Sequence, residues 1–86
     1  MFFIYLLDNT TDDELYVGYT NDLKRRLEEH NQGSNISTKN KEWRCIYYEA
    51  CLLEEDARRR ERYLKTSQGR RMIKMRLREY YRKRAS

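Results

Sequence analysis

The sequence contains no proline, three glycines, two cysteines and a single histidine among its 86 residues. It has no apolar run near the ~20 residues that a helix needs to cross a bilayer, which argues against a membrane protein. The N-terminus lacks the basic segment and the small-residue cleavage site of a signal peptide. The absence of proline together with eight tyrosines argues against a disordered chain. We therefore expect a folded cytoplasmic protein with no membrane partner.

The scarcity of cysteine and histidine excludes two kinds of site. Cys45 and Cys51 lie in one segment typical of a strand, where six residues of extended chain separate them by roughly 20 Å. Two cysteines at that separation cannot form a disulfide with each other. Two thiols with His30 as the only histidine also leave a structural zinc site incomplete. A reduced, cytoplasmic setting agrees with both exclusions.

Charge is abundant and unevenly distributed. Hydrophobic and charged residues each make up 38% of the chain, so a domain of this length must rely on a thin core. We treat residues 1–86 as one domain. Residues 1–56 hold 6 basic and 12 acidic side chains, whereas residues 57–86 hold 13 basic and 2 acidic ones. A local net charge of +11 predicts a polyanionic partner for the C-terminal part.

The hydrophobic pattern predicts a compact alternation of strands and helices. Residues 2–7 and 15–19 predict two strands joined by an acidic turn over 8–14. Thr20, Asn21 and Asp22 are candidate N-caps for a helix that begins at residue 23 and ends near Gly33. Residues 34–42 predict a loop, 43–51 a third strand and 54–66 a helix that Gly69 is expected to break. With a basic helix over about 69–84, the order β-β-α-β-α-α indicates an α/β (α+β) domain.

Several polar residues fall on helix and strand faces that should be buried. Arg26 and His30 share or border the face that carries Leu23 and Leu27, and Glu61 lies on the stripe that carries Ala57 and Leu64. Tyr5 and Tyr16 lie on adjacent strands, where Gly18 would leave space beside a phenol. These residues form a candidate cluster for phosphodiester hydrolysis, made of the following side chains: Tyr5, Tyr16, Arg26, His30 and Glu61.

Each member of this cluster also has a purely structural interpretation. Tyrosines in strands are commonly packing residues, and an Arg–His pair four residues apart is commonly a half-exposed helix edge. An acid among arginines, as at Glu61, is commonly an ion-paired surface residue. Spacing alone therefore leaves both interpretations open.

The order of the motifs resembles the GIY-YIG nuclease superfamily, and in particular its small bacterial single-domain branch. Phe3-Ile4-Tyr5, ten intervening residues and Tyr16-Val17-Gly18 resemble the paired motif that names the superfamily. The similarity continues through residues 20–30, through Ser37-Thr38-Lys39 and through residues 47–50, and residues 57–65 resemble the metal-site helix. It covers residues 2 to about 78. The resemblance implies a three-stranded antiparallel sheet flanked by helices.

The resemblance also implies a role for each residue of the cluster. Tyr5 would be the general base toward water, and Tyr16 would bind or polarise the scissile phosphate. Arg26 would neutralise charge on the phosphate, and His30 occupies a position at which the family has His or Tyr. Glu61 would be the single protein ligand to one Mg²⁺ (or Mn²⁺) ion, which suits an ion that keeps most of its waters. Gly18 would let backbone or substrate approach.

Three positions depart from the family pattern. Phe3 stands where the superfamily name has glycine, and Tyr19 stands where repair-type members carry a lysine. Many full nucleases place an asparagine after the metal-site helix, whereas residues 66–80 contain none and Gln68 is the nearest amide.

The basic C-terminal part indicates nucleic acid as the partner, with DNA favoured over RNA. Six phosphate contacts already give a large salt-dependent affinity, and no base-reading motif is present. We expect little sequence preference and assign substrate binding, beside Gly18, to five cations: Arg58, Arg62, Lys65, Arg70 and Arg71. The leading hypothesis is a metal-dependent endonuclease. This hypothesis includes a preference for branched, nicked or single-stranded forms of the nucleic acid. The alternatives are a binding module with a weak or vestigial site and a nuclease cassette that needs a protein partner for targeting.

Overall fold

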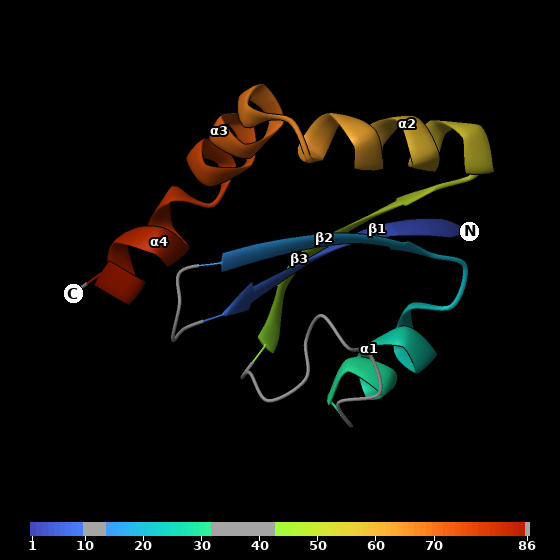
Figure 1. Cartoon of the computed structure of the whole chain (residues 1–86), viewed down its shortest axis with the longest axis horizontal. Coiled ribbons are helices and arrows are strands. Elements are labelled where there is room, and N and C mark those ends of the chain that lie inside the picture. The colour runs from blue at the N-terminus through green and yellow to red at the C-terminus, as the bar shows by residue number, and fades with distance from the viewer. Residues whose placement is uncertain (10–13, 32–42, 86) are drawn as a thin grey trace.

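The structure is a computed structural model that describes residues 1–9, 14–31 and 43–85. Three strands and four helices follow one another along the chain in the order β-β-α-β-α-α-α (Figure 1). The elements are β1 (Phe2–Asn9), β2 (Glu14–Thr20), α1 (Leu23–Asn31), β3 (Trp43–Cys51), α2 (Glu54–Leu64), α3 (Ser67–Arg76) and α4 (Arg78–Ala85). This confirms the α+β class, with one helix more than the sequence pattern predicted.

The sheet is antiparallel and has the strand order β2-β1-β3. Tyr5 pairs with Gly18 and Leu7 pairs with Tyr16, so the two site tyrosines lie on the same face of neighbouring strands. β3 joins the other side of β1, with a bulge opposite Leu6 and Leu7. The central strand is buried from Ile4 to Asn9, while β2 forms one edge of the described sheet.

Helices cover both faces of the sheet. On one face, Ile4, Leu6 and Val17 pack against α2 and α3, and the three buried helix residues of this core are Ala57, Leu64 and Ile73. α1 lies on the opposite face (Figure 1). Within the described residues the candidate site therefore receives side chains from both layers of helices.

The start of α1 follows the predicted capping pattern. The side-chain Oδ1 of Asp22 accepts a hydrogen bond from the backbone N–H of Arg25 at 3.2 Å, as an N-cap residue does. Thr20 Oγ1 accepts from the N–H of Asp22 at 3.0 Å and fixes the turn between β2 and the helix. This short connection places α1 directly beneath β2.

The C-terminal region differs from the single predicted helix over 69–84. The chain leaves helical geometry at Leu77 (φ −104°, ψ 29°), which divides the region into α3 and α4. The turn lets α4 return to the end of β1, where Arg84 donates to the carbonyl oxygen of Asn9 at 3.1 Å. Tertiary contacts of β1, which no local pattern encodes, thus decide where the helix bends.

The sequence predicted that Gly69 breaks the helix over 54–66, and this prediction is wrong. α2 ends at Leu64, and Thr66 caps α3 by accepting from the N–H of Gly69 at 3.0 Å. Gly69 is buried inside α3, where an added Cβ would lie 2.8 Å from Cα of Leu64 and closer still to the carbonyl oxygen of Tyr63. The glycine therefore serves a close approach of two helices.

The predicted acidic turn over 8–14 is shorter in the structure. Asp8 and Asn9 belong to β1 and Glu14 to β2, while residues 10–13 lie outside the described residues. Asp8 is buried and is stabilised by an ion pair with Arg84 at 3.4 Å and a hydrogen bond from the Tyr80 hydroxyl. The predicted loop over 34–42, with Ser37-Thr38-Lys39, also lies outside the described residues.

The structure also bears on the cysteines and on membrane insertion. Cys45 and Cys51 lie on β3 and both are free thiols. Among the described helices, none is both long and apolar enough to traverse a lipid bilayer.

Candidate active site

Three predicted site residues form a hydrogen-bonded chain beneath β2. Tyr5 Oη lies 3.0 Å from His30 Nε2, and Arg26 Nε donates to Tyr5 Oη at 3.3 Å. Arg26 and His30 reach the same hydroxyl because they are one helical turn apart on α1. Arg26 is held from its other end by Glu29, with Nη1 to Oε1 at 3.2 Å. The shared face predicted from spacing is therefore present, and it is turned toward Tyr5.

Burial determines the protonation of this chain. It raises the pKa of Tyr5 to about 12, against the opposing effect of the Arg26 hydrogen bond, so the phenol is neutral at pH 7. Burial, and then the charge of Arg26, lower the pKa of His30, which favours the neutral imidazole. Since Arg26 Nε–H can only donate, the Tyr5 proton is available to a neutral His30 that accepts through Nε2. Hydrogen bonds to Tyr5 and Glu29 raise the pKa of Arg26 and keep its charge permanent.

Aromatic packing holds the two tyrosines and the histidine together. The rings of Tyr5 and Tyr16 have centroids 6.1 Å apart, and His30 meets Tyr16 edge-on at 5.2 Å. The register of β1 and β2, which the sequence left open, places Tyr5 and Tyr16 on one face. The space predicted beside a phenol at Gly18 is filled by Tyr5 itself, since an added Cβ would lie 2.8 Å from Cε1 of that ring.

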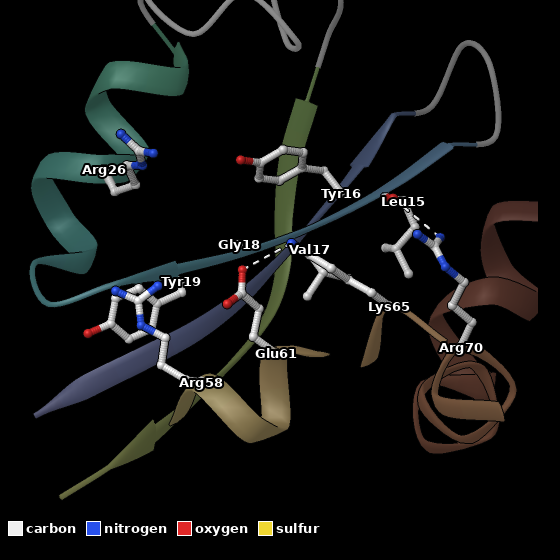
Figure 2. Close-up of a pocket in the computed structure, with 10 residues that line it drawn as sticks. All are labelled: Leu15, Tyr16, Val17, Gly18, Tyr19, Arg26, Arg58, Glu61, Lys65 and Arg70. Atoms are coloured by element: carbon white, nitrogen blue, oxygen red, sulfur yellow. Dashed lines mark hydrogen bonds and ion pairs between the residues drawn. The ribbon is translucent and has the colours of Figure 1, made fainter. Parts of the chain in front are cut away.

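An open cleft of about 380 Å³ runs along β2 next to this cluster. Figure 2 shows Tyr16 and Arg26 on one side of the strand and Glu61, Lys65 and Arg70 on the other. Its lining is Leu15, Tyr16, Val17, Gly18, Tyr19, Arg26, Arg58, Glu61, Lys65 and Arg70. Tyr5 is completely buried and His30 nearly so, and both lie behind the cleft wall. The cleft thus joins side chains that the sheet would otherwise keep on separate faces.

Glu61 reaches the cleft because of its place on α2. Ala57 and Leu64 turn this face of the helix into the core, and Glu61, between them, emerges at the edge of the sheet. Its side chain is 16% exposed and pairs with Lys65, whose Nζ lies 3.1 Å from Oε2. Within the described part of the chain, no three acidic, histidine or cysteine side chains cluster as metal ligands. A metal held here would therefore have Glu61 as its carboxylate ligand.

The predicted substrate-binding cations divide into two groups. Arg58, Lys65 and Arg70 line the cleft, and Arg70 is anchored to the carbonyl oxygen of Leu15 at 3.4 Å. Arg62 and Arg71 are exposed and do not line it. Arg62 follows Glu61 directly, so it points about 100° away around the helix. These two cations belong to the outer surface of the C-terminal helices.

Two contacts of the site were not predicted from the sequence. The Arg58 guanidinium stacks on the ring of Tyr19 at 3.9 Å, and Glu54 joins both by accepting from the Tyr19 hydroxyl at 2.9 Å. Trp43, at the start of β3, packs edge-on against Tyr16 at 6.3 Å. The packing of α2 on β2 brings the first set together, and the sheet order places Tyr16 and Trp43 on the two sides of β1. The one sign of these contacts in the sequence was Tyr19, the aromatic residue directly after the second motif.

Comparisons with known proteins identify the family of this chain. A UPF0213 protein of Bacillus velezensis is 59% identical over 32 residues, a segment that covers 37% of this chain and 30% of that protein. No solved structure matches the chain. The GIY-YIG catalytic domain matches residues 1–78, which includes every residue of the cleft. The chain therefore belongs to the GIY-YIG family of catalytic domains, whose members are nucleases that typically use a divalent metal.

Proposed function

We propose that this protein is a metal-dependent endonuclease that hydrolyses phosphodiester bonds, with DNA as the expected substrate and little preference for sequence. The observation that carries the proposal is the cleft at β2, where Tyr16, Arg26 and Glu61 converge from three different elements. A hydroxyl, a permanent cation and a carboxylate around one cleft are groups suited to phosphodiester hydrolysis. The family match supports the same class of reaction.

Arg26 is the residue that we assign to the scissile phosphate. Its guanidinium is planar and permanently charged. Two of its nitrogens are already oriented, Nε by Tyr5 and Nη1 by Glu29. The side chain is 39% exposed, so the remaining N–H groups can reach an anion in the cleft. Tyr16, on the same side of β2, would donate a hydrogen bond to the phosphate or to the attacking water.

For Tyr5 we propose a variant of the role that the family resemblance implied. A phenol with a pKa of about 12 is a poor holder of negative charge at neutral pH. We assign it the role of a proton conduit. Tyr5 Oη takes the proton of the attacking water while its own proton passes to Nε2 of His30. The water oxygen bonds to phosphorus as the phosphorus bond to the leaving oxygen breaks. The leaving oxygen departs with the electron pair and takes a proton from solvent, His30 releases its added proton to solvent, and Tyr5 stays neutral throughout.

Access to that hydroxyl depends on Arg26. Tyr5 is fully buried, and Arg26 Nε–H lies on its oxygen. Water therefore reaches Tyr5 when Arg26 turns toward a bound phosphate. This order couples substrate binding to exposure of the proton conduit.

Glu61 is the residue that would hold the divalent metal. Its carboxylate is largely buried, faces the cleft and has the Lys65 ammonium as a partner, so this oxygen donor already attracts a cation. One carboxylate suits Mg²⁺, which takes its other ligands from water and phosphate oxygens. When bound, such an ion supplies charge neutralisation at the phosphate.

A second candidate function is a nucleic-acid-binding module with low nuclease activity, or a cassette directed by a protein partner. Two observations favour it. Tyr5 is covered by Arg26, and the Glu61 carboxylate is paired with Lys65. Both contacts must rearrange before the cleft is ready for hydrolysis. Weak intrinsic activity that increases with a correctly bound substrate is the expected consequence.

The decisive experiment compares Glu61→Ala with Glu55→Ala. Glu55 lies on the same helix but is exposed and outside the cleft lining, so its substitution matches the change in charge. Nicking of supercoiled plasmid and of a branched oligonucleotide is measured with Mg²⁺ and with EDTA. We expect Mg²⁺-dependent nicking by the wild type and by Glu55→Ala, and none by Glu61→Ala. Nicking that survives Glu61→Ala would refute the assignment, and binding by the wild type without nicking would favour the second candidate.

A further inference from the structure

Lys65 and Glu61 form an ion pair inside the candidate site. The two residues lie four apart, one at the end of α2 and the other one turn earlier, which brings Nζ to 3.1 Å from Oε2. The carboxylate is 16% exposed, whereas the lysine is 52% exposed and retains room to move. Both line the cleft (Figure 2).

The other cations of the cleft are engaged elsewhere. Arg58 pairs with Glu54, Arg26 with Glu29 and Tyr5, and Arg70 with the carbonyl oxygen of Leu15. Among the described residues, Lys65 is the cation whose ion pair balances Glu61. The charge of the mostly buried Glu61 carboxylate is therefore balanced by one flexible ammonium group, that of Lys65.

We infer that Lys65 is a displaceable counter-ion, which neutralises Glu61 until a divalent cation binds and then becomes available to a phosphate in the same cleft. This inference rests on the proposed function. An ammonium and a divalent cation compete for the same carboxylate oxygens and repel each other at contact distance. The four-carbon stem of lysine lets the charge move within the cleft without a change in the backbone. Lys65 therefore lowers the affinity of the empty site for metal and raises the affinity of the loaded site for nucleic acid.

Metal binding without nucleic acid provides the test. The affinity for Mn²⁺ is measured by the electron paramagnetic resonance signal of the free ion, in the wild type, Lys65→Met, Lys74→Met and Glu61→Gln. Lys65→Met keeps the length of the stem and removes the competing charge. Lys74→Met makes the same change at an exposed residue of α3 that does not line the cleft, so it corrects for bulk electrostatics. We expect Lys65→Met to bind Mn²⁺ roughly two- to fivefold more tightly than Lys74→Met, as the strength of a partly exposed ion pair implies.

A second measurement tests whether Lys65 is available to a phosphate once the metal is bound. Affinity for a short DNA duplex is measured with Ca²⁺ present, and Lys65→Met is expected to bind more weakly than Lys74→Met. Equal Mn²⁺ affinities of Lys65→Met and Lys74→Met, with Glu61→Gln unable to bind Mn²⁺, would overturn the inference about Lys65 and leave the metal site intact. Equal Mn²⁺ affinities of the wild type and Glu61→Gln would instead overturn the metal site itself.

Discussion

The contact between Gly18 and Tyr5 leads to the sharpest prediction about this protein. The Tyr5 ring lies flat across Gly18 on the neighbouring strand, where the glycine offers no side chain. A Cβ at residue 18 would lie 2.8 Å from Cε1 of Tyr5 and closer still to Cζ and Oη. The ring cannot move into solvent, because Tyr5 is completely buried between Tyr16 and His30. Gly18→Ala must therefore displace the ring or separate the strands.

The size of the effect follows from this distance. Carbon atoms in ordinary contact are about 3.5–4.0 Å apart, so the ring has to move by about 1 Å or more. Overpacking of this kind costs about 1–3 kcal/mol of unfolding free energy. A shift of 1 Å also stretches the hydrogen bonds of Tyr5 Oη to His30 and Arg26 beyond useful length. Any nuclease activity should therefore fall further than stability alone requires.

Urea unfolding and plasmid nicking, each at a temperature where the variant is folded, measure the two effects. Tyr5→Leu removes the atoms that clash, so the pair Gly18→Ala and Tyr5→Leu forms a double-mutant cycle. We expect Gly18→Ala to cost about 1–3 kcal/mol in the wild type and much less in the Tyr5→Leu background. A Gly18→Ala protein that unfolds within about 0.5 kcal/mol of the wild type would refute the steric argument. Equal costs in both backgrounds would place the strain somewhere other than the Tyr5 ring.

Two further predictions concern pH and helix packing. Because the pKa of His30 is lowered in the folded state, the unfolded chain binds more protons as pH falls below about 6.5, so the urea midpoint should decline from pH 7.5 to pH 5.5. His30→Gln should flatten that decline, and an equally steep decline in the variant would show that another group is responsible. Gly69→Ala should lower the melting temperature followed by circular dichroism, since its Cβ meets the backbone of Tyr63 and Leu64. The overpacking cost of about 1–3 kcal/mol is offset by the ~1 kcal/mol that alanine gains over glycine in a helix, so the net loss is up to about 2 kcal/mol. A more stable variant would contradict the close approach of the two helices.

The pairing of charges qualifies the interpretation of the basic C-terminal part. The sequence shows a net charge of +11, but several of its arginines are neutralised in the folded protein. Arg59 pairs with Asp56, Arg60 with Glu49 and Arg84 with Asp8. The acids come from β1, β3 and the first turn of α2. The positive charge available to a polyanion is therefore smaller than the sequence count.

Local patterns were sufficient for most of the elements. Aromatic and β-branched residues placed β3 at its observed bounds, and the cap candidates, Asp22 among them, marked the start of α1. The stripe of Ala57, Glu61 and Leu64 placed a carboxylate at the edge of the core. These features depend on residues within a few positions of one another, where backbone geometry alone decides which side chains share a face.

Long-range contacts decided the rest. The pattern of β1 did not show that Asp8 would be buried, because its partners, Tyr80 and Arg84, lie more than 70 residues away. The bend at Leu77 has the same origin, since α4 returns to the end of β1. Arg62 was assigned to substrate binding by its charge, although helical spacing turns it away from Glu61 and it does not line the cleft. Only the structure showed that Arg58 stacks on Tyr19.

The sequence by itself determined the order of elements as far as α2, the family and the identity of the polar residues that do not suit a core. Only the tertiary structure decided that Tyr5 is a buried phenol with a raised pKa, because desolvation depends on what packs around a group from every side. Only the register of β1 and β2 decided that the Tyr5 ring covers Gly18, since a slip of one residue would turn it to the other face. The residue types in the sequence therefore indicated the chemistry of the candidate site, whereas strand pairing and burial decided its geometry.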